Sequence, residues 1–270
     1  YRNCTTYMAG APFQRELISL LTERQLYYEA VALQFGAPIR AVTESTRISL
    51  VRAFPHARWL DATQLVVWLR AIKSAAELHK LETACNWAEG ALEAGVICCL
   101  RGASESNITA QMVNKLLGAP SPSARWPAYA PRVVVGLASQ GGGAVSAGRI
   151  LRGETEGDDQ GELVLLQCAS NCDGYHAPAA RTVFVGAEIP HSIRQMQLLV
   201  NRALNAQVAA MVSGVQAGMV FAAAQTVFST STLPGGSLGR MGYSVGLSSA
   251  VDSCDCPLEL TSFCEIPLVA

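Results

Sequence analysis

The chain has 270 residues, of which 50% are hydrophobic and only 15% are charged, and its formal net charge is −1. A chain this apolar can form a substantial core, so the composition excludes a disordered protein. The near-neutral charge excludes a domain that binds nucleic-acid phosphates through a basic surface, and we expect no nucleic-acid partner. The length allows one large domain, or one domain with part of another.

The nine cysteines lie in apolar segments and lack the spacing of a secreted disulfide framework. We therefore expect reduced thiols that pack as small hydrophobic side chains in an intracellular compartment. The pairs Cys98-Cys99 and Cys254 and Cys256 lack the C-x-x-C spacing that suits zinc. The chain begins with Tyr1 rather than Met, which favours removal of a targeting leader, and we expect the mitochondrial matrix rather than the cytoplasm.

The N-terminal part of the chain is predicted to be mainly helical. Apolar residues at three- and four-residue steps over 16–33 favour a helix with an interruption. A second helix is predicted over 43–54, where Pro55 ends it. Residues 59–61 then favour a short strand.

A long helix is predicted to begin after Ser74, because Ser74 followed three residues later by Glu77 forms the capping-box pattern. An apolar stripe at helical spacing follows as far as Val96. A shorter helix is predicted over 108–117, with Ser106 or Asn107 as its cap.

The β-rich part of the chain begins with a strand over 132–136. The runs 163–168 and 181–185 are separated by turn residues at 171–174, so we expect an antiparallel pair. Pro190 is placed to open a long helix, and the hairpin is expected to pack against that helix.

No charged residue occurs between Ala203 and Gly239. A membrane-spanning helix needs about 20 strongly apolar residues, and this stretch is diluted by Asn, Gln, Ser and Gly. We therefore expect two buried helices separated near Ser213-Gly214. The stretch is longer than one core helix requires, so we also expect it to leave an apolar face that docks on a partner.

Three stretches of the chain resemble the creatinase and Xaa-Pro aminopeptidase family, which has the pita-bread fold. They are Leu69–Leu78, Gly174–Gly186 with its Tyr-His-Ala-Pro sequence, and Arg240–Leu247 with its Gly-Tyr-Ser sequence. They follow the family's order over about residues 60–270, and these forms are most similar to the ectoine-hydrolase-like and creatinase-like branch. The resemblance implies an α+β fold in which helices cover a curved antiparallel sheet. It assigns residues 1–70 to a remnant of the creatinase-type N-terminal domain and residues 71–270 to a pita-bread domain that lacks its final strands.

Metallopeptidases of this family hold two divalent ions with two aspartates, one histidine and two glutamates. In the resemblance, the aspartate positions fall on Gln167 and Pro178, and the histidine position falls on Tyr243. Glutamine is a poor charge-neutralising ligand, proline has no side-chain donor, and tyrosine is rarely used at such sites. The glutamates would lie after Ala270. We therefore expect a degenerate site with no metal and no other cofactor, and we assign no catalytic residue.

Metal-free relatives use a histidine on the loop that corresponds to residues 137–149, and this loop contains no histidine here. His176 lies in the hairpin motif, and the resemblance implies that it faces the substrate cleft. We expect Tyr175 and Arg181 to be turned toward the same residual cleft. For Arg181 a structural ion pair is the favoured role, because an arginine on a buried strand needs a partner.

Three functions follow from these expectations. The first is a pseudoenzyme that serves as a structural or accessory subunit, because the chain has 15% charged residues where about a quarter is usual. Its expected partners are other protein subunits, with a second copy of the chain and a membrane complex as further candidates. The second function is a metal-independent amidohydrolase that acts on a small amino-acid derivative. The third is a binding module that keeps the cleft without turnover.

Overall fold

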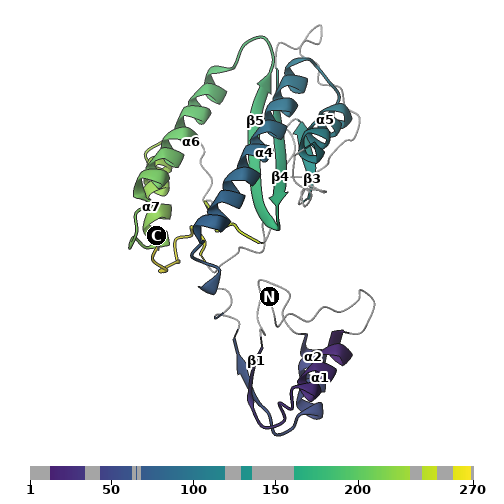
Figure 1. The fold of residues 1–270 in the computed structure, drawn as a ribbon. Helices are drawn as coiled ribbons and strands as arrows, with labels where there is room; N and C mark the ends of the chain where they lie inside the picture. Colours follow the sequence, from purple (N-terminus) through teal and green to yellow (C-terminus); the bar gives the residue numbers. More distant parts are fainter. Residues whose placement is uncertain are drawn as a thin grey trace. The chain divides into compact units, whose positions relative to one another are not determined.

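The computed structural model describes residues 13–33, 43–62, 65, 68–118, 129–135, 161–231, 239–247 and 258–268. The chain divides into two compact units, residues 1–70 and 71–270, and the elements of each are labelled in Figure 1. The loop 137–149, in which relatives carry a histidine, lies outside the described residues.

The first unit combines two helices with a small parallel sheet. Its elements are α1 (Phe13–Glu23), β1 (Ala30–Leu33), α2 (Glu44–Ala53) and β2 (Arg58–Asp61). The strands pair from Ala30 with Arg58 to Leu33 with Asp61. Leu21, Val31, Leu50 and Phe54 form the core of this unit. The predicted helix over 43–54 and the predicted strand over 59–61 are both confirmed.

The second half of the helix predicted over 16–33 is wrong. The helix ends at Glu23, Gln25 adopts a positive φ of 57°, and residues 30–33 form a strand. The backbone of this strand is satisfied by β2, which lies more than 20 residues further along the chain. Such a pairing overrides local periodicity, because strand propensity depends on the neighbours that a strand finds.

The second unit begins with α4 (Ala75–Leu100), which has the predicted capping box. The amide of Glu77 donates to Oγ of Ser74 at 3.4 Å, and the amide of Ser74 donates to Oε2 of Glu77 at 2.6 Å. The next helix, α5, spans Glu105–Leu117 and is capped by Ser104, whose Oγ accepts from the amide of Asn107 at 3.3 Å. The prediction of Ser106 or Asn107 as the cap is therefore wrong, because the helix already begins at Glu105.

The sheet of this unit has the order β3-β4-β5 and is antiparallel throughout. Its strands are β3 (Tyr129–Val135), β4 (Glu162–Cys172) and β5 (Tyr175–Val185). A two-residue turn joins β4 to β5, with positive φ at Asp173 and Gly174. Oδ1 of Asn171 accepts from the amide of Gly174 at 2.8 Å and closes the turn. The predicted hairpin is confirmed.

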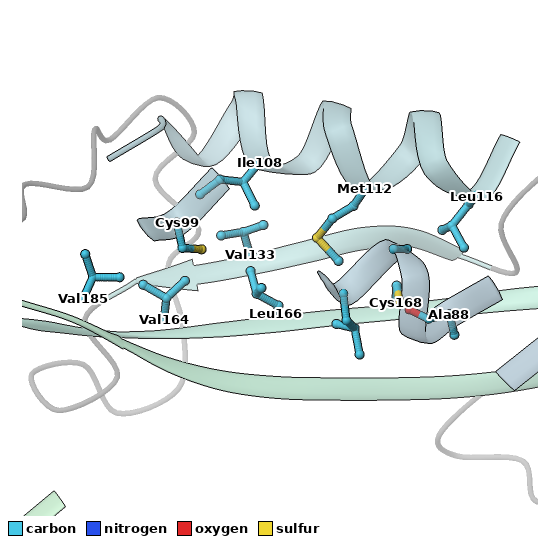
Figure 2. Close-up of a cluster of buried hydrophobic side chains, with 12 residues drawn as sticks. Ala88, Cys99, Ile108, Met112, Leu116, Val133, Val164, Leu166, Cys168 and Val185 are labelled. Atoms are coloured by element: carbon cyan, nitrogen blue, oxygen red, sulfur yellow. Dashed lines mark hydrogen bonds between the residues drawn. The ribbon is translucent and has the colours of Figure 1, made fainter. Parts of the chain in front are cut away.

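Helices α4 and α5 pack against one another and against this sheet, and α4 lies over the hairpin (Figure 1). Figure 2 shows Ile108, Met112 and Leu116 of α5 directed toward the strands that carry Val133 and Leu166. Gly95 allows α4 to approach closely, since a Cβ at this position would lie 2.9 Å from Sδ of Met112 and 3.0 Å from Cδ1 of Leu166. The main core of the second unit therefore lies between these helices and the sheet.

The chain continues through α6 (His191–Ala210) and α7 (Ala217–Ser229), which pack against one another. Pro190 precedes the first turn of α6, as predicted, and Gly214 adopts a φ of 87° in the turn between the helices. The expectation that both helices are buried is wrong for α6, in which Ala203 and Gln207 are the buried residues. No described helix has the length and apolar character needed to cross a membrane.

The last described segments, 239–247 and 258–268, pack beside α7 and the hairpin. Backbone hydrogen bonds join Met241 to Leu260 at 2.9 Å and Ala217 to Ile266 at 2.9 Å. The amide of His176 in β5 donates to the carbonyl of Gly246 at 2.8 Å. This bond attaches the glycine-rich segment to the start of β5.

Candidate functional site

The hairpin has two faces, and the pairing register of β4 and β5 decides on which face each residue lies. On one face, Val164, Leu166 and Cys168 are buried in the core beneath α4. Gln167 lies opposite Ala180, and Ala169 lies opposite Pro178. Directly opposed residues point to the same side of an antiparallel sheet, and successive residues alternate sides. Gln167 and Pro178 therefore share the face that is turned away from α4.

His176 lies on this same face, because it is paired with Asn171, four residues after Gln167. It is half-buried, and its amide is bound to Gly246. The structure thus brings three of the predicted site residues, Gln167, Pro178 and His176, onto one side of the hairpin.

Tyr175 and Arg181 lie on the opposite face, and the expectation that they are turned toward the former cleft is corrected. The hydroxyl of Tyr175 donates to Oε1 of Glu77 at 2.8 Å, and Nη2 of Arg181 lies 3.6 Å from Oε1 of Glu89. Both carboxylates belong to α4. The physical reason is register, since these two residues are paired with Cys172 and Leu166 of the buried face.

The ion pair between Arg181 and Glu89 matches the structural role that the sequence favours for this arginine. The two side chains are 61% and 59% exposed. An ion pair this exposed contributes little stability, about 0–1 kcal/mol, because water screens it.

Tyr243 lies on the segment beside α7 and forms an isolated bridge with Glu259. The guanidinium carbon of Arg240 lies 5.1 Å from the centre of the Tyr243 ring. Nη1 of Arg240 donates to Oε1 of Glu259 at 2.9 Å. The three side chains form one cluster, in which the cation is held by both an aromatic face and a carboxylate.

Two neighbouring cavities of about 460 Å³ each border α6, and Val200 lines both. The first lies between β5 and α6, with Arg181, Phe184 and Met196 among its lining residues. The prediction that the hairpin packs against the helix after Pro190 is therefore corrected: the hairpin packs on α4, and α6 faces β5 across this cavity. Gln167, Pro178 and His176 line neither cavity, although Ala180, Thr182 and Phe184 of the same face line the first.

The second cavity brings together Tyr243, which the sequence had singled out, and two polar residues that it had not, Gln207 and Arg240. Gln207, Arg240 and Tyr243 line it together with apolar side chains of α6 and α7. Of these, Tyr243 was singled out by the family motif. No sequence pattern distinguishes Gln207 from the other polar residues of α6, because its burial arises from the packing of α7.

The structure resembles solved members of a family of peptidases. It superposes with a TM-score of 0.74 on X-Pro aminopeptidase from Thermotoga maritima, at 17% identity, covering 97% of this chain and 68% of the other. A dipeptidase from Pyrococcus horikoshii gives a TM-score of 0.75 at 18% identity, covering 98% and 68%. The N-terminal domain of the FACT complex subunit SPT16 from chickpea gives 0.72 at 13% identity, covering 97% and 63%. These similarities show that residues of this chain adopt the pita-bread fold.

In sequence, the chain is 26% identical over 209 residues to ectoine hydrolase from Halomonas elongata, which covers 75% of this chain and 50% of that protein. The chain therefore spans half the length of this curated relative. The model of metallopeptidase family M24 matches residues 79–261, which is more than half of the chain and includes both the hairpin and the Gly-Tyr-Ser segment. This chain belongs to metallopeptidase family M24.

Proposed function

We propose that this chain is a non-catalytic member of the M24 family that acts as a structural or accessory subunit of a larger protein assembly. The observation that carries the proposal is the identity of the residues at three metal-ligand positions of the family motifs, Gln167, Pro178 and Tyr243. The proposal has two parts, loss of the metal site and association with other proteins, and each has its own experiment.

The chemistry of the side chains supports the first part. A pair of divalent cations needs several carboxylates to neutralise it, and the face that carries Gln167 and Pro178 offers an amide oxygen and a side chain without a donor. The third position, Tyr243, is occupied by a phenol that packs against Arg240. Within the described ranges, no three His, Cys, Asp or Glu side chains come together as a metal-ligand group. These residues do not fit a dinuclear metal centre.

The exposed apolar face of α6 supports the second part. Leu198 and Val208 are 58% and 60% exposed on this helix, and neither lines the two cavities beside it. A large apolar surface on a folded protein is typical of a protein–protein contact. The fold is also found in a protein that is a complex subunit, since the SPT16 domain shares it at a TM-score of 0.72.

Elemental analysis of the purified native protein tests the loss of the metal site. We expect no stoichiometric manganese, cobalt or zinc, and no heat of binding when Mn²⁺ or Co²⁺ is titrated into the protein after dialysis against a chelator. Two equivalents of a divalent metal in the native protein would contradict the proposal.

Light scattering coupled to size-exclusion chromatography tests the association. We expect the native protein to elute with a mass above the 28.6 kDa of one chain. Leu198→Asp and Val208→Asp place a charge on the apolar face of α6, and each should lower the measured mass. Leu100→Asp is the matched control, because Leu100 is 67% exposed on α4. A lone monomer with amidase turnover would overturn both parts.

A second candidate function is a metal-independent amidohydrolase that acts on a small amino-acid derivative. Two observations favour it: the 26% identity to ectoine hydrolase, and the location of His176 on the face of the family's ligand positions. Mass spectrometry of ectoine incubated with the native protein tests it. Gain of one water by ectoine, insensitive to chelator and abolished by His176→Ala but retained by His79→Ala on the exposed side of α4, would establish this function over the first.

A further inference from the structure

One buried side chain of the second unit has an unused hydrogen-bond donor. Gln207 of α6 is 5% exposed, and its Nε2 has no hydrogen-bond partner among the described residues. Leaving a buried amide donor unpaired is unfavourable, and such groups are rare in folded proteins. The unpaired Nε2 of Gln207 therefore indicates that a bound molecule accepts its hydrogen bond.

Gln207 lines the second of the two cavities beside α6, which has a volume of about 460 Å³. Cavities that bind small molecules have volumes of roughly 300–1,000 Å³ and combine an apolar lining with a few polar groups. This cavity follows that pattern, because side chains such as Leu204, Phe228 and Met241 provide most of its lining.

The cationic side chain at the cavity is already paired with a carboxylate. Among the described residues that line it, Arg240 is the one cation. The Arg240 guanidinium is bound to Glu259 at 2.9 Å and lies against the ring of Tyr243. A carboxylate ligand would compete with Glu259 for this cation and would be repelled by it. A neutral acceptor has no such cost, so the cavity favours a neutral ligand.

We propose that this cavity binds a neutral, mainly apolar molecule whose carbonyl oxygen accepts a hydrogen bond from Nε2 of Gln207. Gln167 and Pro178 do not line this cavity, whereas Tyr243, which occupies the family's histidine position, does. The inference does not depend on whether the chain turns over a substrate or belongs to an assembly.

Isothermal titration calorimetry with N-acetyl-leucinamide as the probe tests the site, because this molecule joins neutral carbonyl groups to an apolar side chain. N-acetyl-leucine, which carries a carboxylate, is the charged comparison. We expect the neutral probe to bind more tightly. Gln207→Leu keeps the approximate volume but removes the donor, and it should weaken binding by about five- to tenfold, the usual effect of one lost hydrogen bond.

The matched control is Gln225→Leu on α7. Gln225 also has a buried amide atom without a partner among the described residues, its Oε1, but it does not line the cavity. This variant should bind the probe as the wild type does. In the wild-type protein, the side-chain amide resonance of Gln207 should also shift on addition of the probe, which keeps the test valid if Gln207→Leu fails to fold.

Three outcomes would overturn the inference: equal binding by Gln207→Leu and the wild type, tighter binding of the carboxylate probe, or an unchanged Gln207 amide resonance at saturating neutral probe. None of them bears on metal content or oligomeric mass, so failure here is distinguishable from failure of the proposed function.

Discussion

The hydroxyl of Tyr175 donates a hydrogen bond of 2.8 Å to Oε1 of Glu77, which joins the start of β5 to the first turn of α4. The other oxygen of the same carboxylate, Oε2, accepts from the amide and the hydroxyl of Ser74 at 2.6 and 2.7 Å. These hydrogen bonds lower the pKa of Glu77 to about 2, and the bond from the Ser74 hydroxyl makes the largest contribution. One carboxylate therefore caps the helix and attaches it to the sheet.

Replacing this carboxylate should change the stability of the protein in acid. Because the pKa of Glu77 is below its ordinary value of 4.5 in the folded state, its contribution is fully present above pH about 4.5 and is lost as the pH falls toward about 2. Glu77→Gln should therefore flatten the pH dependence of the free energy of unfolding across this window. Urea unfolding at pH 7 and pH 3 measures it.

Because Glu77 is partly exposed to water, Glu77→Gln should change the free energy of unfolding at pH 7 by about 1 kcal/mol at most. Tyr175→Phe should remove a smaller part of the stability that Glu77 contributes, because it removes only one of the hydrogen bonds to the carboxylate. Glu93→Gln, on an exposed position of α4, is the control. Identical pH dependence in Glu77→Gln and the wild type would show that this carboxylate has no such role.

The effects of alanine substitutions at Ser104 and Ser106 on stability test which serine caps α5. Ser104→Ala should lower the free energy of unfolding by about 1 kcal/mol, because it removes the acceptor of an amide at the start of the helix. Ser106→Ala should have little effect, since Ser106 is exposed within the first turn. Chemical denaturation of both variants measures the difference, and equal losses would contradict the assigned cap.

The core between α4, α5 and the sheet should depend strongly on Ile108. This side chain is 0% exposed, so Ile108→Ala should lower the free energy of unfolding by about 2–5 kcal/mol through lost burial and a new cavity. Ile97→Ala is the control for the same chemical change, because Ile97 is 49% exposed on α4. Denaturant unfolding of both variants, with unchanged m values, would establish the difference, and a loss at Ile108 no larger than that at Ile97 would contradict this core.

The cysteines should differ in their reaction with iodoacetamide. Burial raises the pKa of Cys99 and Cys168 to about 11, and the reactive thiolate is scarce at such a pKa. Burial also raises the pKa of Cys85, but its side chain is exposed. Peptide mass spectrometry after labelling at pH 8 should find Cys85 modified in the native protein, and Cys99 and Cys168 modified only in urea. Early labelling of Cys168 would contradict its position in the core.

Gln207→Leu provides a further test in the absence of any ligand. Removing an unsatisfied buried amide and replacing it with an apolar side chain should raise the free energy of unfolding by about 1 kcal/mol. Thermal and urea unfolding of the ligand-free variant measure this. A loss of stability equal to that of an ordinary core truncation would show that the amide has a partner in the folded chain.

The sequence by itself determined those features that depend on residues close together in the chain. The start of α4 follows from Ser74 and Glu77, which lie three residues apart, and the hairpin follows from alternating β-rich runs around the turn at Asp173-Gly174. The family motifs, too, are short stretches whose order along the chain was enough to indicate the pita-bread fold.

Only the tertiary structure decided which surfaces meet. The pairing of β1 with β2 converted the end of a predicted helix into a strand, because its backbone found a distant partner. The register of the hairpin placed Tyr175 and Arg181 beneath α4 and left His176 on the other face. The burial of Gln207 depends on α7 and the segment beyond it. Local patterns report the propensity of a segment, whereas burial and side-chain contacts depend on long-range packing that no local pattern contains.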